Sequence, residues 1–418
     1  MTDGVDDRLA ELVRDEGARI LATLARTVGD LRLAEDAVQE ATMAALRTWP
    51  VSGIPHDPRA WLAVTARHRA IDLLRREQRR AGKEQEGVAL MQLSGPDGPS
   101  TQTVRDDQLR LIFTCCHPAL SLPARVALAL RVLCGLSVEQ VAACLLTTPA
   151  ATAKRLTRTR TKITAAGIPY RVPADEDLPE RLLAVCAVVH ALYTAGHTAA
   201  AGPALGQVEV SREAIRLARR LVELMPDEAA PAAVLASLLL TEARRATRTD
   251  PAGEVVLLAD QDRSRWDRAA IAEGIELLNR SLRRTGGTAD AYQLQAALAA
   301  QHALAPTYAD TDWAEILRLY DLLRSVYPSA AVELNRVVAI AEVHGPAAGR
   351  DALDRVRMHD ARWWAVRAEL LARDGAYADA VTAAERALAC EAAEPEQRHR
   401  RRRRDEWAAR AQAAAIDG

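Results

Sequence analysis

The sequence lacks the features that several protein classes require. Among its 418 residues are one Phe and six Cys, and no two Cys have CxxC spacing. Scattered Cys of this kind predict neither a disulfide framework nor a zinc site. We find no run of about 18 apolar residues, and the N-terminus is acidic and amphipathic, unlike a signal peptide. We therefore expect a cytoplasmic protein with no membrane association.

The chain also lacks an overall excess of either charge. Its 55 Lys and Arg nearly balance its 56 Asp and Glu, which excludes a protein that is basic throughout. Locally the balance shifts: residues 58–80 hold seven basic side chains against two acidic, and residues 150–171 hold six against none. Residues 172–395 are acidic, with 24 basic side chains against 33. This distribution predicts an anionic partner for the N-terminal part only.

Helix-forming residues are abundant. Apolar residues recur at spacings of three and four in nearly every segment, Ala, Leu, Arg and Glu dominate, and alternating strand patterns are scarce. The sequence therefore predicts an all-α fold. Two stretches rich in Gly, Pro and polar residues divide it. The predicted parts are a helical bundle (1–80), a flexible linker (81–103), a second helical domain (104–165), a connector (166–177), a large helical domain (178–395) and a basic tail (396–418).

Residues 135–163 have the pattern of a helix-turn-helix. Ser137 is suited to cap the first helix, and Gln140 completes a capping box. After a short turn, Thr148 is suited to cap the second helix, with Pro149 at its first position. We expect the second helix to bury Ala153, Leu156 and Ile163.

The exposed face of this second helix has the composition of a DNA recognition helix. Small or polar residues near its start can reach base edges, and cations on its flanks can meet phosphates. The predicted DNA contacts are Ala151, Thr152, Lys154, Arg155, Arg158 and Lys162.

The first 80 residues contain an acidic helix followed by a basic one. The acidic helix covers residues 30–49, and the basic helix covers residues 58–80. We expect Trp49 and Trp61 to be core residues rather than platforms for base stacking. The arginines of the second helix are free to meet phosphate, and those predicted to contact DNA are Arg67, Arg69, Arg75, Arg76 and Arg79.

These motifs resemble a known family. AEDAVQEATMAALRTWP followed by PRAWLAVTARHRAIDLLRR is similar to region 2 of bacterial sigma factors of the extracytoplasmic-function (ECF) group, and the helix-turn-helix is similar to region 4. FTCCHPAL, AGIPYRVP and DQDRSRWDR resemble a subgroup with a C-terminal extension similar to tetratricopeptide repeats. One position departs from the family pattern, because His68 stands where members commonly have Asn.

The resemblance implies a transcription initiation factor. Region 2 of that family docks on the β′ clamp helices of core RNA polymerase and opens the −10 promoter element, and region 4 docks on the β flap and reads the −35 element. By this resemblance the arginines of residues 58–80 contact the −10 element, and the recognition helix contacts the −35 element. The implied contacts with core polymerase are Glu35, Asp36, Gln39 and Glu40. The resemblance implies no cofactor, metal or catalytic residue.

The sequence of the large C-terminal domain predicts stacked helix pairs with a concave surface that could bind a protein partner. In its clearest repeat, Gly375 occupies the turn, and Tyr377, Ala380, Ala384 and Ala387 occupy packing positions. In DQDRSRWDR, acidic and basic residues alternate, which favours an internal salt-bridged corner or interdomain docking over catalysis. The predicted docking residues are Asp260, Asp262, Arg265 and Asp267.

Two other functions stay open on the sequence alone. A helix-turn-helix regulator that acts without polymerase, with the C-terminal domain binding a partner, would need a dimer interface and would leave the region 2 motif without a purpose. An enzyme built on the C-terminal domain ranks last, because the chain lacks Gly-rich phosphate loops and a nucleophile elbow.

Overall fold

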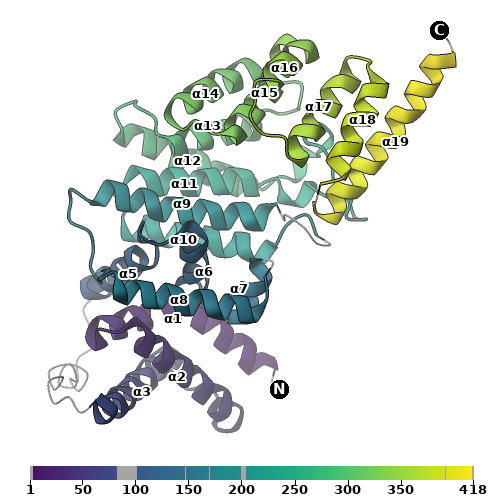
Figure 1. The fold of residues 1–418 in the computed structure, drawn as a ribbon. Helices are drawn as coiled ribbons and strands as arrows, with labels where there is room; N and C mark the ends of the chain where they lie inside the picture. The colour runs from purple at the N-terminus through teal and green to yellow at the C-terminus, as the bar shows by residue number, and fades with distance from the viewer. Residues whose placement is uncertain are drawn as a thin grey trace. The chain divides into compact units, whose positions relative to one another are not determined.

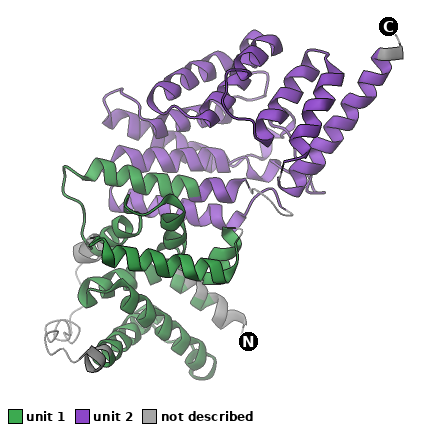
Figure 2. Ribbon diagram, in the orientation of Figure 1, with its two compact units in different colours: residues 1–191 green, residues 192–418 purple. Residues whose placement is uncertain are grey.

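The computed structural model describes residues 3–81, 101–145, 147–168, 170–198, 204–390 and 392–416. Every regular element in these ranges is a helix, apart from one isolated β-bridge between Thr249 and Val255. The all-α prediction is therefore confirmed. The chain divides into two compact units, unit 1 (residues 1–191) and unit 2 (residues 192–418), and the division falls inside one helix (Figure 2).

Within the described residues, unit 1 contains seven complete α-helices and the start of α9 (Figure 1). They are α1 (Asp3–Val28), α2 (Leu31–Ser52), α3 (Pro58–Ala81), α5 (Thr101–Cys115), α6 (Leu122–Leu128) with the π-helical turn η1 (Ala129–Leu133), α7 (Val138–Cys144), α8 (Pro149–Ala165) and α9 (Leu178–His197).

Helix α2 packs against α1 and α3 through small residues. Asp30 caps it, because its Oδ1 accepts a hydrogen bond from the Arg32 backbone N–H at 2.7 Å. Alanines spaced three and four residues apart form a buried stripe that lets the neighbouring helices approach closely. The stripe ends at Trp49, which is 1% exposed and packs edge-on against the half-buried Trp61. The prediction that Trp49 is a core residue is confirmed.

The two helical domains expected within residues 1–165 belong to one compact unit. The buried carboxylate of Asp107, on α5, lies 2.9 Å from Arg26 Nε of α1 and also pairs with Arg110. Tyr170 of the predicted connector donates a hydrogen bond to the Ala22 carbonyl of α1 at 2.9 Å. A buried ion pair and a side chain from the connector therefore join segments far apart in the sequence. Residues 82–100 of the predicted linker lie outside the described residues.

Helix α9 is the one described helix that is long and apolar enough to cross a membrane, with a mean hydropathy of 1.3. We expected no such segment from the sequence. Two charged residues, Glu180 and Arg181, lie near its start, and its apolar side chains Val185, Val188 and Leu192 are fully buried. This burial is the pattern of a core helix.

Unit 2 contains the rest of α9 and ten further α-helices, with three short 3₁₀ turns (Figure 1). They are α10 (Val208–Leu224), α11 (Ala229–Glu242), η2 (Arg245–Thr247), η3 (Leu258–Asp260), η4 (Arg263–Arg265), α12 (Arg268–Arg284), α13 (Ala291–Leu304), α14 (Trp313–Val326), α15 (Ala330–His344), α16 (Pro346–Leu353), α17 (Ala361–Arg373), α18 (Tyr377–Leu388) and α19 (Glu394–Ile416).

Helices α10 to α19 pack mainly against their neighbours in sequence, which agrees with the predicted arrangement of helix pairs. Between α17 and α18, Gly375 has φ of +80°, a backbone conformation that favours glycine at the turn. The predicted packing residues Ala380, Ala384 and Ala387 are buried. The repeat assignment itself stays a prediction.

The predicted basic tail forms most of α19, which packs against α18. Arg403 binds the carboxylate of Glu369 on α17 at 2.9 Å, and Trp407 is buried. This segment is therefore packed against α17 and α18 and is not a free basic extension.

Candidate nucleic-acid interface

The predicted helix-turn-helix forms as two capped helices, α7 and α8. Ser137 Oγ accepts from the Gln140 backbone N–H at 3.2 Å, and Gln140 Oε1 accepts from the Ser137 backbone N–H at 2.8 Å. Thr148 caps α8 through a hydrogen bond from the Ala151 backbone N–H, with Pro149 at the first helical position. Both helix starts therefore agree with the sequence prediction.

One predicted DNA contact on α8 is wrong. Thr152 is fully buried, and its hydroxyl has no hydrogen-bond partner among the described residues. The buried stripe of α8 runs through Thr152, Leu156 and Thr159, spaced by four and three residues, so Thr152 faces the core. Ala153, which we expected to be buried, is exposed for the same reason.

The other predicted contacts on α8 are accessible. Four of them are exposed and Arg155 is half-buried; the exposed residues are Ala151, Lys154, Arg158 and Lys162. They form a surface with three cations and a small residue near the helix start, as DNA recognition requires. This surface lacks Thr152 but keeps its charge.

A further arginine of α8 contacts α2. Arg160 Nη2 lies 2.7 Å from Glu35 Oε1, and Arg160 Nε lies 2.8 Å from Glu35 Oε2. Arg131 also approaches Gln39, with Nη2 3.4 Å from Oε1. Glu35 is a predicted polymerase contact, yet its side chain is only 10% exposed. The helical spacing that identified the acidic face of α2 gave no signal for a partner so distant in sequence.

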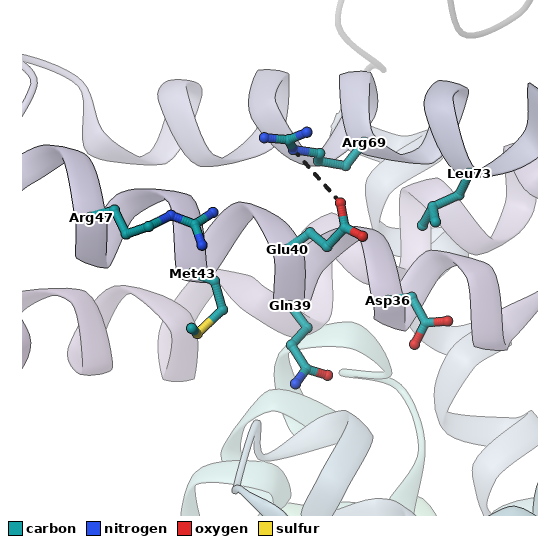
Figure 3. A pocket seen from close by; sticks show the side chains of 7 residues that line it. All are labelled: Asp36, Gln39, Glu40, Met43, Arg47, Arg69 and Leu73. Carbon is teal, nitrogen blue, oxygen red and sulfur yellow. Dashed lines mark ion pairs between the residues drawn. The ribbon is translucent and has the colours of Figure 1, made fainter. Parts of the chain in front are cut away.

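The remaining predicted polymerase contacts line a groove of about 450 Å³ between α2 and α3 (Figure 3). Its walls carry carboxylates, arginines and apolar side chains: Asp36, Gln39, Glu40, Met43, Arg47, Arg69 and Leu73. Met43 is 47% exposed, and sequence reasoning missed it. Met43 therefore adds an apolar side chain to the charged lining of the groove.

The predicted −10 arginines of α3 have different surroundings. Arg75 and Arg76 are exposed, whereas Arg67 is half-buried. Arg69 lies 3.8 Å from Glu40, on the groove between α2 and α3. The side chain of Arg79 lies outside the described residues. Thus Arg69 lies on the predicted polymerase groove, away from Arg75 and Arg76 by more than one helical turn.

The DQDRSRWDR segment of unit 2 has an inner and an outer set of side chains. The predicted docking residues are all exposed: Asp260, Asp262, Arg265 and Asp267. Asp262 and Asp267 cap η4 and α12, and the segment's acidic and basic residues form no ion pair with one another in the described ranges. The alternative of an internal salt-bridged corner is therefore wrong, because the carboxylates accept backbone N–H groups instead.

The inner set was missed at the sequence level. Gln261, Arg263 and Trp266 are buried, and Trp266 Nε1 donates to Thr247 Oγ1 at 2.9 Å. The sequence carries no signal for this burial, because alternating charges do not show which side chains face inward. Cys115 and Cys116 of unit 1 are also buried, and burial raises the pKa of the Cys116 thiol to about 12.

Two family models match the chain. Residues 12–80 match sigma-70 region 2, and residues 181–282 match a family of unknown function, DUF6596. The first match covers most of α1, all of α2 and all but the last residue of α3. Helices α2 and α3 form the groove, and α3 carries the arginines predicted to contact the −10 element. The second begins in α9 and ends in α12.

Two relatives extend this result. An uncharacterized protein of Rhizobium meliloti is 39% identical over 381 residues, which cover 88% of each chain. A probable ECF RNA polymerase sigma factor, SigI, of Mycobacterium tuberculosis is 33% identical over 121 residues, which cover 28% of this chain and 41% of that protein. The chain therefore belongs to the sigma-70 family of transcription initiation factors, in a form related to the ECF group that carries a C-terminal helical extension.

Proposed function

We propose that this sigma factor binds core RNA polymerase through the groove between α2 and α3 and recruits it to promoters that α8 reads at the −35 element. The observation that carries the proposal is the combination of a sigma-70 region 2 with a capped helix-turn-helix in the same compact unit. A DNA-binding module alone would not need region 2.

The chemistry of the two surfaces fits this division of labour. The groove offers the carboxylates of Asp36 and Glu40 beside exposed Met43, a mixture suited to a partner protein with basic and apolar side chains. The exposed face of α8 offers cations, which suit phosphates. Arg75 and Arg76 of α3 supply a second cationic surface for the −10 region.

Few aromatic side chains are available for stacking on unpaired bases. Aromatics make up 4% of the chain, and Trp49 in region 2 is buried. Opening of the −10 element would then depend on a small number of specific contacts, since base–aromatic stacking contributes about 1–3 kcal/mol per base. We therefore propose strict promoter choice.

Reconstituted transcription tests the proposal. Core polymerase is incubated with a fragmented genomic DNA pool, with and without the full chain, and the transcripts are sequenced. We expect a set of start sites that requires the protein and shares −35 and −10 elements. Footprints on the same DNA without polymerase, and no protein-dependent transcript, would instead favour a regulator that acts alone.

We further propose that unit 2 regulates or braces the sigma regions in the cytoplasm, where the polymerase acts. A chain that ends at His197 retains all of α9 and removes the rest of unit 2. If unit 2 braces the sigma regions, which we favour, transcription from the recovered promoters falls in the truncated chain. If unit 2 inhibits them, transcription rises.

A further inference from the structure

Three arginines of unit 2 act on one another electrostatically. Arg244 follows α11, Arg248 follows η2, and Arg263 begins η4; we call them the arginine cluster. No described carboxylate forms an ion pair with any of the three, whereas the adjacent Arg245 is held by both carboxylate oxygens of Glu242. Residues 199–203, which lie outside the described ranges, contain no charged side chain.

The three guanidinium groups raise the local positive potential together. Arg244 interacts electrostatically with both Arg248 and Arg263. Burial lowers the pKa of all three, that of Arg248 to about 10 with a further contribution from Arg244. Like charges brought together away from water disfavour one another, so the cluster is electrostatically unfavourable by itself.

Two histidines report the same positive potential. Burial, followed by the charges of Arg248 and Arg244, lowers the pKa of His197 to about 2. Burial, followed by Arg244 and Arg263, lowers the pKa of His302 to about 4. Both imidazoles are therefore neutral near pH 7, and neither adds charge to the cluster or removes it.

Hydrogen bonds hold the arginines in place but do not neutralise them. Arg248 Nη1 donates to the His197 carbonyl at 2.6 Å, and Arg263 Nη1 donates to the carbonyls of His302 and Ala305 at 2.8 and 2.7 Å. Arg263 is only 6% exposed, and its Nη2 is buried without a hydrogen-bond partner among the described residues. A buried charged donor without a partner is costly, so such a group usually binds a water molecule or a ligand.

We propose that unit 2 contains an oxyanion-binding site formed by Arg244, Arg248 and Arg263, and that this site takes a small ligand carrying a phosphate or carboxylate group. Guanidinium groups bind both kinds of oxyanion through paired, charge-assisted hydrogen bonds. Two carboxylates act electrostatically on the cluster. Glu242 is already engaged by Arg245 and by the Tyr193 hydroxyl at 3.0 Å, and the exposed Asp310 accepts a hydrogen bond from the Thr307 hydroxyl at 2.7 Å. All three arginines lie within the match to the family of unknown function, and the site does not depend on the proposed role in transcription.

Thermal unfolding of the full chain tests the site. The unfolding midpoint is measured against increasing sodium phosphate, sodium pyrophosphate or sodium citrate, each matched in ionic strength with sodium chloride. We expect a saturable increase in the midpoint beyond that in chloride, because a ligand that binds the folded state alone stabilises it. An increase with phosphate and pyrophosphate alone assigns a phosphorylated ligand, and an increase with citrate alone assigns a carboxylate. No increase with any of the three overturns the proposal.

Three variants locate the binding. In Arg244→Gln, the anion concentration that gives half of the maximal shift is expected to rise by about tenfold, the effect of losing one charge-assisted hydrogen bond. Arg219→Gln removes an exposed arginine of unit 2 that pairs with Glu273, and Arg158→Ala removes a cation of the DNA-binding face. Both are expected to respond as the wild-type chain does. Loss of the response in Arg158→Ala, with a normal response in Arg244→Gln, would place the anion on α8 and contradict the proposal.

A calorimetric titration covers the case in which Arg244→Gln does not fold. The wild-type chain is titrated with the effective anion, and Arg248→Lys, which keeps the positive charge but loses the planar fork, replaces Arg244→Gln. Weaker binding in Arg248→Lys supports the site, and equal heats in Arg248→Lys, Arg219→Gln and the wild type overturn it.

Discussion

Arg160 of α8 and Glu35 of α2, separated by 125 positions, form a bidentate ion pair. Its nitrogen–oxygen distances are 2.7 Å from Nη2 and 2.8 Å from Nε. The pair joins the predicted recognition helix to the helix predicted to contact polymerase. Its side chains are 25% and 10% exposed, so solvent screens it less than a surface pair. In this arrangement Glu35 is engaged within unit 1, and a polymerase contact through Glu35 requires that the pair open.

Removing this pair should loosen α8 locally. Arg160→Ala leaves the mostly buried carboxylate of Glu35 without its partner, and a hydrogen bond to a charged group contributes about 1.5–3 kcal/mol. We expect amide hydrogen exchange in α8 to accelerate by roughly tenfold or more, measured by mass spectrometry. Arg158→Ala is the matched control, because Arg158 is exposed on the same helix and forms no ion pair among the described residues. Equal exchange in both variants would contradict the importance of the pair.

The buried position of Thr152 predicts that it does not read DNA. Thr152→Val preserves the shape of the side chain and removes a buried hydroxyl without a partner, so stability should be unchanged or rise by about 1 kcal/mol. Affinity for a promoter duplex recovered by reconstitution should be unchanged. Arg158→Ala should weaken the same binding, by about 1–3 kcal/mol at one base position if Arg158 contacts a base. A loss of affinity in Thr152→Val would restore Thr152 to the interface.

The groove of α2 predicts a polymerase-binding defect that leaves the fold intact. Asp36 and Glu40 have side chains 46% and 42% exposed, with partners at 3.6 and 3.8 Å, and such surface pairs contribute about 0–1 kcal/mol. Charge reversal of both residues to Lys should therefore abolish co-purification with core polymerase while changing the melting temperature little. Glu180→Lys, an exposed acid elsewhere in unit 1, should bind normally. Normal yield in the double variant would show that the groove is not the contact.

Local features of the sequence predicted local structure well. The caps at Ser137 and Thr148 and the turn glycine Gly375 follow from short-range rules, and the structure has each of them. The buried face of α8 was predicted less well. Thr152 and Thr159 belong to the buried stripe, although their polar side chains suggested exposure. The error arose because burial depends on what packs against the helix.

Contacts between residues far apart in the chain could not be predicted from the sequence. Nothing local to Glu35 points to Arg160, and nothing in DQDRSRWDR shows that its aspartates cap helices while Arg263 is buried. Charge alternation suggested salt bridges, yet the carboxylates of Asp262 and Asp267 accept hydrogen bonds from backbone N–H groups at helix starts. The arginine cluster likewise becomes visible only when α11, η2 and η4 are brought together.

Close packing of α12 on α11 predicts that Gly274 cannot be enlarged. A Cβ at Gly274 would lie 2.8 Å from Leu240 Cγ, so the gain in helix propensity of about 1 kcal/mol should be outweighed by overpacking of about 1–3 kcal/mol. Gly274→Ala should therefore lower the melting temperature of unit 2. Gly17→Ala is the control, because its Cβ would meet only Val13 Cγ1 at 3.4 Å, and it should stabilise α1. A higher melting temperature in Gly274→Ala would show that α11 and α12 can move apart to accept the methyl group without loss of stability.

His302 predicts a pH dependence of stability in unit 2. Its Nδ1 is buried without a partner among the described residues, its ring lies 5.4 Å from that of Trp313, and Arg244 and Arg263 act on it electrostatically. Burial and these charges lower its pKa from 6.5 to about 4. Between these two values the unfolded chain binds a proton that the folded chain does not.

The free energy of unfolding should therefore fall as the pH is lowered from about 6.5 toward 4, with a slope from this residue of at most about 1.4 kcal/mol per pH unit. Below the folded pKa both states are protonated, and the contribution levels off. Chemical denaturation of the wild-type chain and of His302→Gln between pH 4 and 8 isolates the contribution of His302. The carboxylates titrate alike in the two proteins, so their contribution cancels in the difference. The wild type minus variant difference should be constant above pH 7.5 and decrease on acidification. If the difference stays constant throughout, His302 does not remain neutral in the fold, and the positive potential inferred around Arg244 and Arg263 is absent.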